Sequence, residues 1–136
     1  MMTPHEILEA LIRIRPDFRA YWDDDGNFFR GEDGTFTGCG VFTEFGHFFR
    51  KQHAKMKKEE LVALGAFIAL AESDDFLADA AYTCFLENIA GDPSDDTLAP
   101  YLSPAATKFI DAWRPQKKRP IQPPQTTTGS SAPDRV

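Results

Sequence analysis

The largest concentration of carboxylates in the chain lies between residues 72 and 96. This stretch, ESDDFLADAAYTCFLENIAGDPSDD, holds eight acids, no lysine and no arginine. Paired carboxylates act as general acid and base only where their surroundings separate their pKa values. Asp79 with Glu87, and Asp92 with Asp95, are the candidate pairs, but no nucleophile motif, P-loop, GxSxG or metal triad accompanies them. The sequence therefore predicts no catalytic residue and no enzyme, and favours a binding role.

A second acidic run imitates the start of a calcium loop. Asp23, Asp25 and Asn27 have the spacing of the first three EF-hand ligands. Counting from Asp23 places Phe28 where the motif needs glycine and Gly34 where it needs the bidentate glutamate. We therefore predict no metal and no cofactor, with a weaker calcium site in this loop as the alternative.

The two cysteines, Cys39 and Cys84, are too few and too far apart for a disulfide framework or a CxxC metal knuckle. Each stands among apolar residues, so the sequence predicts two buried free thiols. The chain shows neither a run of eighteen apolar residues nor a positively charged segment followed by an apolar block. We therefore expect no membrane association and a cytoplasmic protein.

Charge divides the chain into two parts. Up to residue 113 there are twenty acids against ten bases, whereas the remainder carries five bases and one acid. The acidic part repels nucleic acid and anionic lipid and attracts a basic protein surface. The proline-rich end cannot bury enough apolar surface to fold, so we expect a helical domain over residues 1–114 and a disordered tail over 115–136.

Helical patterns run through the first part. Thr3 with Glu6 has capping-box spacing, which predicts a helix from Pro4 to Arg15. Residues 23–38 are rich in Asp, Gly and Asn and predict a long loop or a short hairpin. Further amphipathic helices are expected after Cys39, over 58–72, from Ser73, and from Ser103 to Trp113. We therefore predict an all-α fold, a single compact bundle of about five helices.

Three details of these helices are also predicted. Gly46 is expected to mark a close approach of another backbone. Ser73 is expected to cap the helix that follows it, with Asp74 and Asp75 in its first turn. Asn88 is expected to be buried and bonded to the backbone of a neighbouring loop.

Three segments carry a family resemblance. CGVFTEFGHFFR, TCFLENIAGD and LAPYLSPAATKFIDAW, spread over residues 36–113, are similar to segments of a family of small, all-helical, largely uncharacterised bacterial proteins. In size and acidity these proteins resemble the immunity proteins that accompany polymorphic or secreted toxins. The resemblance implies an all-helical fold and an inhibitory function, and it implies no catalytic residue.

Charge and resemblance together predict an immunity protein that neutralises a cognate toxin by covering its basic active-site cleft with an acidic face. The toxin domain is the expected partner, and nucleic acid and membrane are not. The predicted contact residues are the acids of the two runs: Asp23, Asp24, Asp25, Asp74, Asp75, Asp79, Glu87, Asp92, Asp95 and Asp96. The alternative is a helical scaffold or regulatory adaptor that binds another protein through the Phe-rich segment 28–49, which holds seven of the twelve phenylalanines.

Overall fold

The computed structural model describes residues 2–114, and these form helices and connecting loops without a strand, so the all-α prediction is confirmed. Seven helical rods appear in this part of the chain, rather than about five. They comprise α1 (Pro4–Ile14), α2 (Phe18–Trp22), α3 (Gly38–Gln52), α4 (Lys58–Ala69), the composite rod α5–η3–α6, α7 (Pro93–Leu98) and α8 (Pro104–Asp111). The composite rod consists of α5 (Asp75–Ala78), the π-helical η3 (Asp79–Leu86) and α6 (Glu87–Ile89). The predicted tail lies outside the described residues.

Local sequence signals set the helix ends. Thr3 accepts a hydrogen bond from the Glu6 N–H while Glu6 accepts one from the Thr3 N–H, which completes the predicted capping box of α1. Ser103 caps α8 in the predicted way through the Ala106 N–H. Asp74, rather than Ser73, caps the composite rod, because its carboxylate accepts the N–H groups of Phe76 and Leu77.

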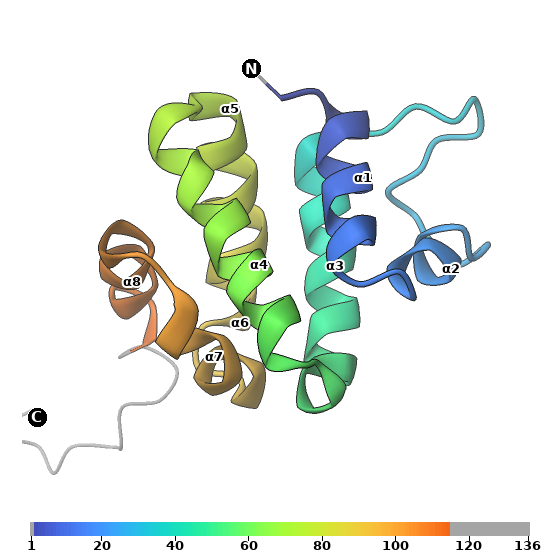
Figure 1. Ribbon diagram of the computed structural model, residues 1–136. Helices are drawn as coiled ribbons and strands as arrows, with labels where there is room; N and C mark the ends of the chain where they lie inside the picture. The colour runs from blue at the N-terminus through green and yellow to red at the C-terminus, as the bar shows by residue number, and fades with distance from the viewer. Residues whose placement is uncertain (1, 115–136) are drawn as a thin grey trace, which may run out of the picture.

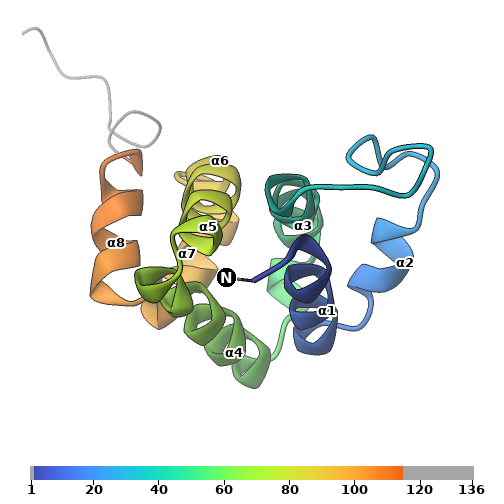
Figure 2. The same ribbon diagram turned by 90° about the horizontal axis from the view of Figure 1, so that it is seen from above.

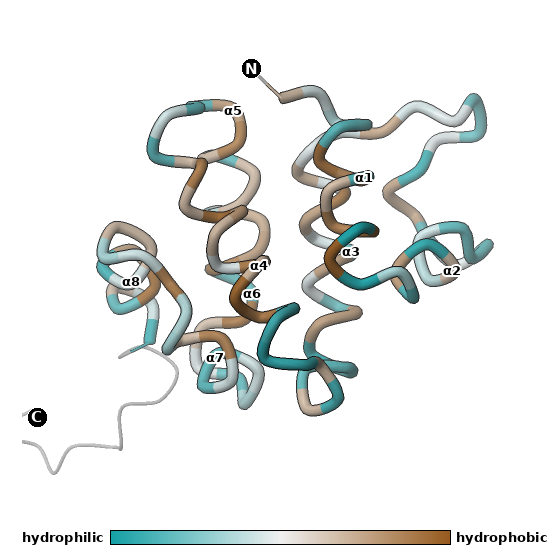
Figure 3. The backbone as a smooth tube through the Cα atoms, viewed as in Figure 1, coloured by the Kyte–Doolittle hydropathy of each residue, from teal (hydrophilic) through white to brown (hydrophobic). Residues whose placement is uncertain are grey.

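The core lies between α3 and the composite rod, with α1 and α4 packed over them (Figures 1 and 2). Phe85 of η3 is fully buried, and its ring lies 5.6 to 5.9 Å from the rings of Phe42, Phe45 and Phe49 on α3. Such pairs add to the free energy gained by burying their surface. The hydropathy colouring shows apolar segments of α1, α3 and α4 lying among more polar ends (Figure 3).

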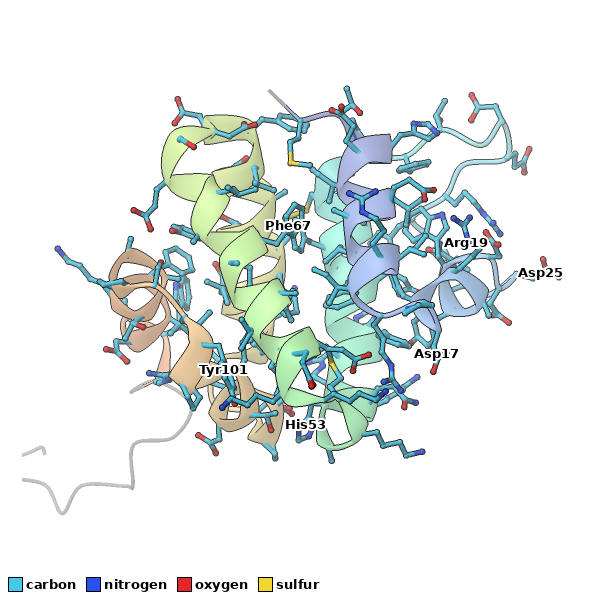
Figure 4. The ribbon with its side chains drawn as sticks, in the orientation of Figure 1. Asp17, Arg19, Asp25, His53, Phe67 and Tyr101 are labelled. Carbon is cyan, nitrogen blue, oxygen red and sulfur yellow. A yellow bond between two sulfur atoms is a disulfide. The ribbon has the colours of Figure 1, made fainter. Side chains whose placement is uncertain are left out.

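Two helices approach closely at a glycine. A Cβ atom on Gly65 of α4 would lie 2.1 Å from the carbonyl oxygen of Tyr101, in η4 (Ala99–Tyr101). Tyr101 lies beside α4 at the end nearer α8 (Figure 4). The sequence had pointed to Gly46 for such an approach, and that prediction is wrong, because a Cβ there would meet only the Phe85 ring at 3.6 Å.

The two cysteines form a disulfide, so the prediction of free thiols is wrong. Cys39, in the first turn of α3, is bonded to Cys84 of η3 with the two Cα atoms 5.4 Å apart. Cys39 is exposed and Cys84 is buried. Forty-five residues separate them along the chain, and the parallel packing of the two helices, with the start of α3 beside the start of the composite rod, brings them together.

Candidate functional site

The segment between α2 and α3, residues 23–37, is a long loop rather than a hairpin, and buried hydrogen bonds hold it in place. Asn27 is only 5% exposed. Its amide donates to the Trp22 carbonyl oxygen at 2.8 Å, and its side-chain oxygen accepts the Phe29 N–H at 2.9 Å. Because the side chain satisfies both ends of the turn, the residues between them are fixed without secondary structure.

A second brace closes the far end of the loop. The Gly31 N–H donates to the Thr35 carbonyl oxygen at 2.8 Å, and Gly34 turns the chain with a φ of 85°. Asp33 accepts from the hydroxyl and the N–H of Thr35 at 2.7 and 3.0 Å. These bonds, the hydroxyl first, lower the pKa of Asp33, so the carboxylate stays charged at neutral pH.

The loop presents one phenylalanine almost wholly to solvent. Phe28 is 93% exposed, the largest exposed fraction among the large apolar side chains of the described residues. Phe29, at 37%, instead leans on α3, where its Cβ lies beside Gly40. A fully exposed ring on a braced loop gains nothing for the fold, and its burial against a partner would release about 2 to 3 kcal/mol.

Three predicted contact residues precede this ring in the same loop. Asp23, Asp24 and Asp25 are all exposed, and Asp25 extends from the edge of the molecule (Figure 4). Residues 23–37 hold five acids and a single base, Arg30. Arg30 pairs with Asp23 at 3.5 Å and also donates to the Asp23 and Asp24 carbonyl oxygens. We name the exposed set Asp23, Asp24, Asp25, Phe28 and Phe29 the loop surface.

The acids at the start of the composite rod divide between structure and surface. Asp74 accepts N–H groups from Leu77, Met2 and Phe76, at 3.1, 2.9 and 3.1 Å. Those bonds lower its pKa, the Leu77 bond most. Asp74 is therefore used as a helix cap, whereas Asp75 and Asp79 are exposed.

Asp75 and Asp79 border a shallow hollow between the composite rod and α8. The hollow has a volume of about 550 Å³, and its aromatic walls are Phe76, Tyr82 and Phe109. The Tyr82 hydroxyl is buried without a hydrogen-bond partner, and burial, aided by Glu72, raises its pKa. The hollow is therefore a second acidic and aromatic surface, on the other side of α3 from the loop.

The acids around α7 are mostly part of the fold. Asp95 is 1% exposed and forms a two-bond ion pair with Arg114, at 2.7 and 2.8 Å. Its Oδ2 also accepts the Gly91 N–H at 3.0 Å. The prediction that Asp95 contacts a partner is therefore wrong, because its carboxylate is buried and bonded within the chain.

Asp92 caps α7. Burial alone raises its pKa, but the hydroxyl and N–H of Ser94, at 2.6 and 2.9 Å, outweigh burial and lower it. Asp96, within α7, is exposed, and Glu87, the first residue of α6, is half-buried. Asn88, predicted to be buried, is exposed and donates to the Cys84 carbonyl oxygen of its own rod.

The ten predicted acids thus occupy three separate places instead of one face. The loop extends from one side of the bundle, α5 lies at the end where α3 begins, and α7 lies at the opposite end (Figure 1). Of these acids, only Asp23, Asp24 and Asp25 share an irregular loop with a large exposed apolar side chain. The loop surface is therefore the strongest candidate site.

Sequence reasoning missed how the first turn of α3 joins the two acidic surfaces. A Cβ on Gly38 would lie 3.4 Å from the Phe76 ring, and one on Gly40 would lie 3.0 Å from the Phe29 Cβ. Cys39 stands between them and carries the disulfide to the composite rod. The triplet Gly-Cys-Gly was the available signal, since two glycines in one helical turn weaken a helix unless neighbours need the space.

Within residues 2–114, no three His, Cys, Asp or Glu side chains are grouped so as to hold a metal ion. The same residues include no helix long and apolar enough to cross a bilayer. No family model, curated protein or solved structure matches the chain.

Proposed function

We propose that this protein is an immunity protein that neutralises a bacterial toxin by binding a basic surface of that toxin with its loop surface. The carrying observation is that Phe28 is 93% exposed on a hydrogen-bonded loop that also holds three exposed aspartates, Asp23, Asp24 and Asp25. The family resemblance supports a toxin as the partner, and the exposure of the loop surface supports that surface as the contact.

The two kinds of side chain have different tasks in this proposal. Exposed carboxylates speed the encounter with a basic protein and orient it, an effect that salt weakens. The Phe28 ring then enters an apolar pocket of the toxin, and burial of a phenylalanine contributes about 2 to 3 kcal/mol. Because Asn27 already fixes the loop, little conformational entropy is lost on binding.

This arrangement changes the predicted mechanism in one respect. Asp74, Asp92 and Asp95 serve the fold, so a broad acidic face covering the toxin cleft is replaced by a small aromatic anchor with an acidic rim. Asp75 and Asp79 lie on the opposite side of the first turn of α3 from the loop surface. They form a second contact if the toxin surface is wide enough to reach both places.

The disulfide bears on where the encounter takes place. Disulfides persist in oxidising compartments and are rare in cytosolic proteins. A cytoplasmic location was predicted from the sequence, but the Cys39–Cys84 bond favours an oxidising compartment such as the bacterial periplasm. We propose that the toxin is neutralised there.

The adaptor alternative loses much of its predicted surface. Of the seven phenylalanines in residues 28–49, only Phe28 and Phe29 are exposed. The other five are wholly or partly buried: Phe36, Phe42, Phe45, Phe48 and Phe49. No separate apolar groove remains along this segment to receive a helix.

Survival during co-expression tests the proposal. The toxin domain encoded beside this gene is expressed with the wild-type protein, with Phe28→Ser or with Phe28→Tyr, each directed to the periplasm. We expect the wild type and Phe28→Tyr to protect and Phe28→Ser to protect poorly at equal protein level. Equal killing with and without the wild-type protein would refute the immunity function, and full protection by Phe28→Ser would refute the role of the loop.

A further inference from the structure

A hollow between α2 and α3 adjoins the loop surface. It has a volume of about 560 Å³, and its walls include Tyr21 of α2 and one face of α3 that holds Glu44, Phe48 and Lys51. α2 lies beside α3 at the edge of the bundle from which the loop extends (Figures 1 and 2). Asp24 belongs both to the loop surface and to the lining of the hollow, so the two are continuous.

Glu44 is the buried charge of this hollow. It is 8% exposed, whereas the other charged residues of the lining, Asp17, Asp24 and Lys51, are exposed. Its Oε1 lies 3.2 Å from His47 Nδ1, and no hydrogen bond from residues 2–114 reaches its Oε2. Burying a carboxylate is costly unless its oxygens are bonded. Because the Glu44 side chain lines the hollow, Oε2 is available to a donor that enters it.

Lys51 does not neutralise Glu44, although it is the one base among the described residues that line this hollow. Its Nζ donates to the Tyr21 hydroxyl at 3.2 Å and lies 5.2 Å from the centre of the Tyr21 ring. Lys51 also follows Glu44 by seven residues, which separates them by about 10 Å along the axis of α3. The positive charge of Lys51 is therefore held at the other end of the hollow.

The neighbouring arginines are paired with other acids. Arg15 pairs with Asp17 at 3.3 Å, and Arg30 pairs with Asp23 at 3.5 Å. The remaining two carboxylates of the lining form no ion pair with a lysine or arginine of residues 2–114. The end of the hollow nearer the loop is therefore negative, and it is complementary to a cation.

We propose that this hollow binds an arginine side chain of the partner protein, whose guanidinium donates to Glu44 while the exposed Asp24 attracts it at the rim. The proposal rests on the proposed function and adds a second anchor beside Phe28. A guanidinium is more weakly hydrated than an ammonium group and stacks on aromatic rings, so it suits a partly enclosed hollow with Tyr21 and Phe48 in its walls. The apolar stem of the arginine packs against the same rings.

Titration of the full, oxidised protein with butylguanidinium, followed by NMR, tests the hollow without the toxin. We expect a Kd of about 1 to 10 mM, with the largest amide shifts at residues 20–26 and 44–52. Butylurea, the uncharged analogue, should bind at least about tenfold more weakly. Glu44→Gln should weaken the binding of butylguanidinium roughly tenfold. The matched control is Glu59→Gln, which removes an exposed acid from another hollow and should bind as the wild type does.

Affinity for the toxin domain provides the second arm of the test. Glu44→Gln should weaken the complex by roughly tenfold, and Glu59→Gln should leave it unchanged. The amide spectrum of each variant establishes that it is folded.

Four results would each overturn the proposal: no binding of butylguanidinium, equal binding of it by the wild type and Glu44→Gln, equal binding of butylurea, or a toxin complex that Glu44→Gln does not weaken. A wild-type protein that binds butylguanidinium at this hollow but binds no toxin would support the cation site and contradict the proposed function.

Discussion

Cys39 in the first turn of α3 is covalently joined to Cys84 in the middle of the composite rod. The bond lies beside the core cluster of Phe42, Phe45 and Phe85 and connects the two helices that enclose it. It also holds the end of the loop that carries Phe28 against the helix that carries Asp75 and Asp79. Fold stability and the candidate site therefore share one covalent constraint.

Reduction of this disulfide is expected to lower the free energy of unfolding. Closing a loop of 45 residues stabilises the native state by about 4 kcal/mol in the chain-entropy treatment. Urea unfolding with and without reductant measures the difference. The control variant Cys39→Ala/Cys84→Ala is expected to have the same free energy of unfolding as the reduced wild type, with or without reductant. A wild-type protein whose free energy of unfolding is also unchanged by reductant would contradict the pairing.

Asp95→Asn is expected to destabilise the fold by about 3 kcal/mol, because it leaves the Arg114 guanidinium beside a neutral, buried amide. The bonds of Asp95 are also the first cause of the raised pKa of Arg114. Asp111 bonds the same guanidinium from an exposed position, so Asp111→Asn is the matched control, with an expected change below about 1 kcal/mol. Similar losses in both variants, measured by urea unfolding, would show that burial of Asp95 does not matter.

Stability is expected to fall in acid partly through Asp74. Its pKa is lowered in the folded protein, chiefly by the Leu77 N–H, so its contribution is complete above the ordinary aspartate value of about 3.9. The contribution is lost as the pH falls through the lower folded value. Asp74→Asn, which still caps but does not titrate, should flatten the decline below about pH 4.

The control for this pH effect is Asp75→Asn, since Asp75 accepts none of the three N–H bonds made to Asp74. Thermal unfolding between neutral pH and about pH 2 compares the variants. If Asp75→Asn flattened the curve as much as Asp74→Asn, the cap would not be the source of the pH dependence.

Association with the toxin domain is expected to depend on the charges of the loop. The double substitution Asp24→Asn/Asp25→Asn should lower the association rate about three- to tenfold at low salt and change the dissociation rate little. Glu9→Gln/Glu59→Gln removes two exposed acids elsewhere and is expected to retain most of the wild-type rate. Surface plasmon resonance at several salt concentrations measures both rates, and equal slowing in the two double variants would assign the effect to net charge.

The sequence predicted those parts of the fold that depend on neighbouring residues. Thr3 with Glu6 and Ser103 with Pro104 marked helix starts correctly. Gly91, with a φ of 85°, follows the end of α6, a position that favours glycine. Such signals are local, because a cap bonds an N–H only two or three residues away.

Contacts between distant segments were not predictable in the same way. Nothing in the spacing of Cys39 and Cys84 reveals that α3 and η3 lie side by side. Gly46 and Gly65 both stand inside amphipathic patterns, and only the path of Tyr101 shows which of them another backbone approaches. A single sequence contains no information on that path.

The acidic run illustrates the same limit for the candidate site. Asp74, Asp92 and Asp95 look alike in the sequence, yet two are caps and one neutralises Arg114 across 19 residues. Carboxylate counting therefore overestimated the acidic surface. Asp23, Asp24 and Asp25 stay exposed because they follow the end of α2 and cap no helix, although Asp23 pairs with Arg30 and Asp24 accepts the Gly26 N–H.

Hydrogen exchange of the full, oxidised protein, alone and with its toxin domain, tests the central claim most directly. We predict that amides of residues 23–37 exchange more slowly in the complex, while those of α7 are unchanged. Phe28→Ser should lose this protection at concentrations where the wild type shows it. Protection confined to α7 or α4, with residues 23–37 exchanging as in the free protein, would contradict the claim that the loop surface binds the toxin.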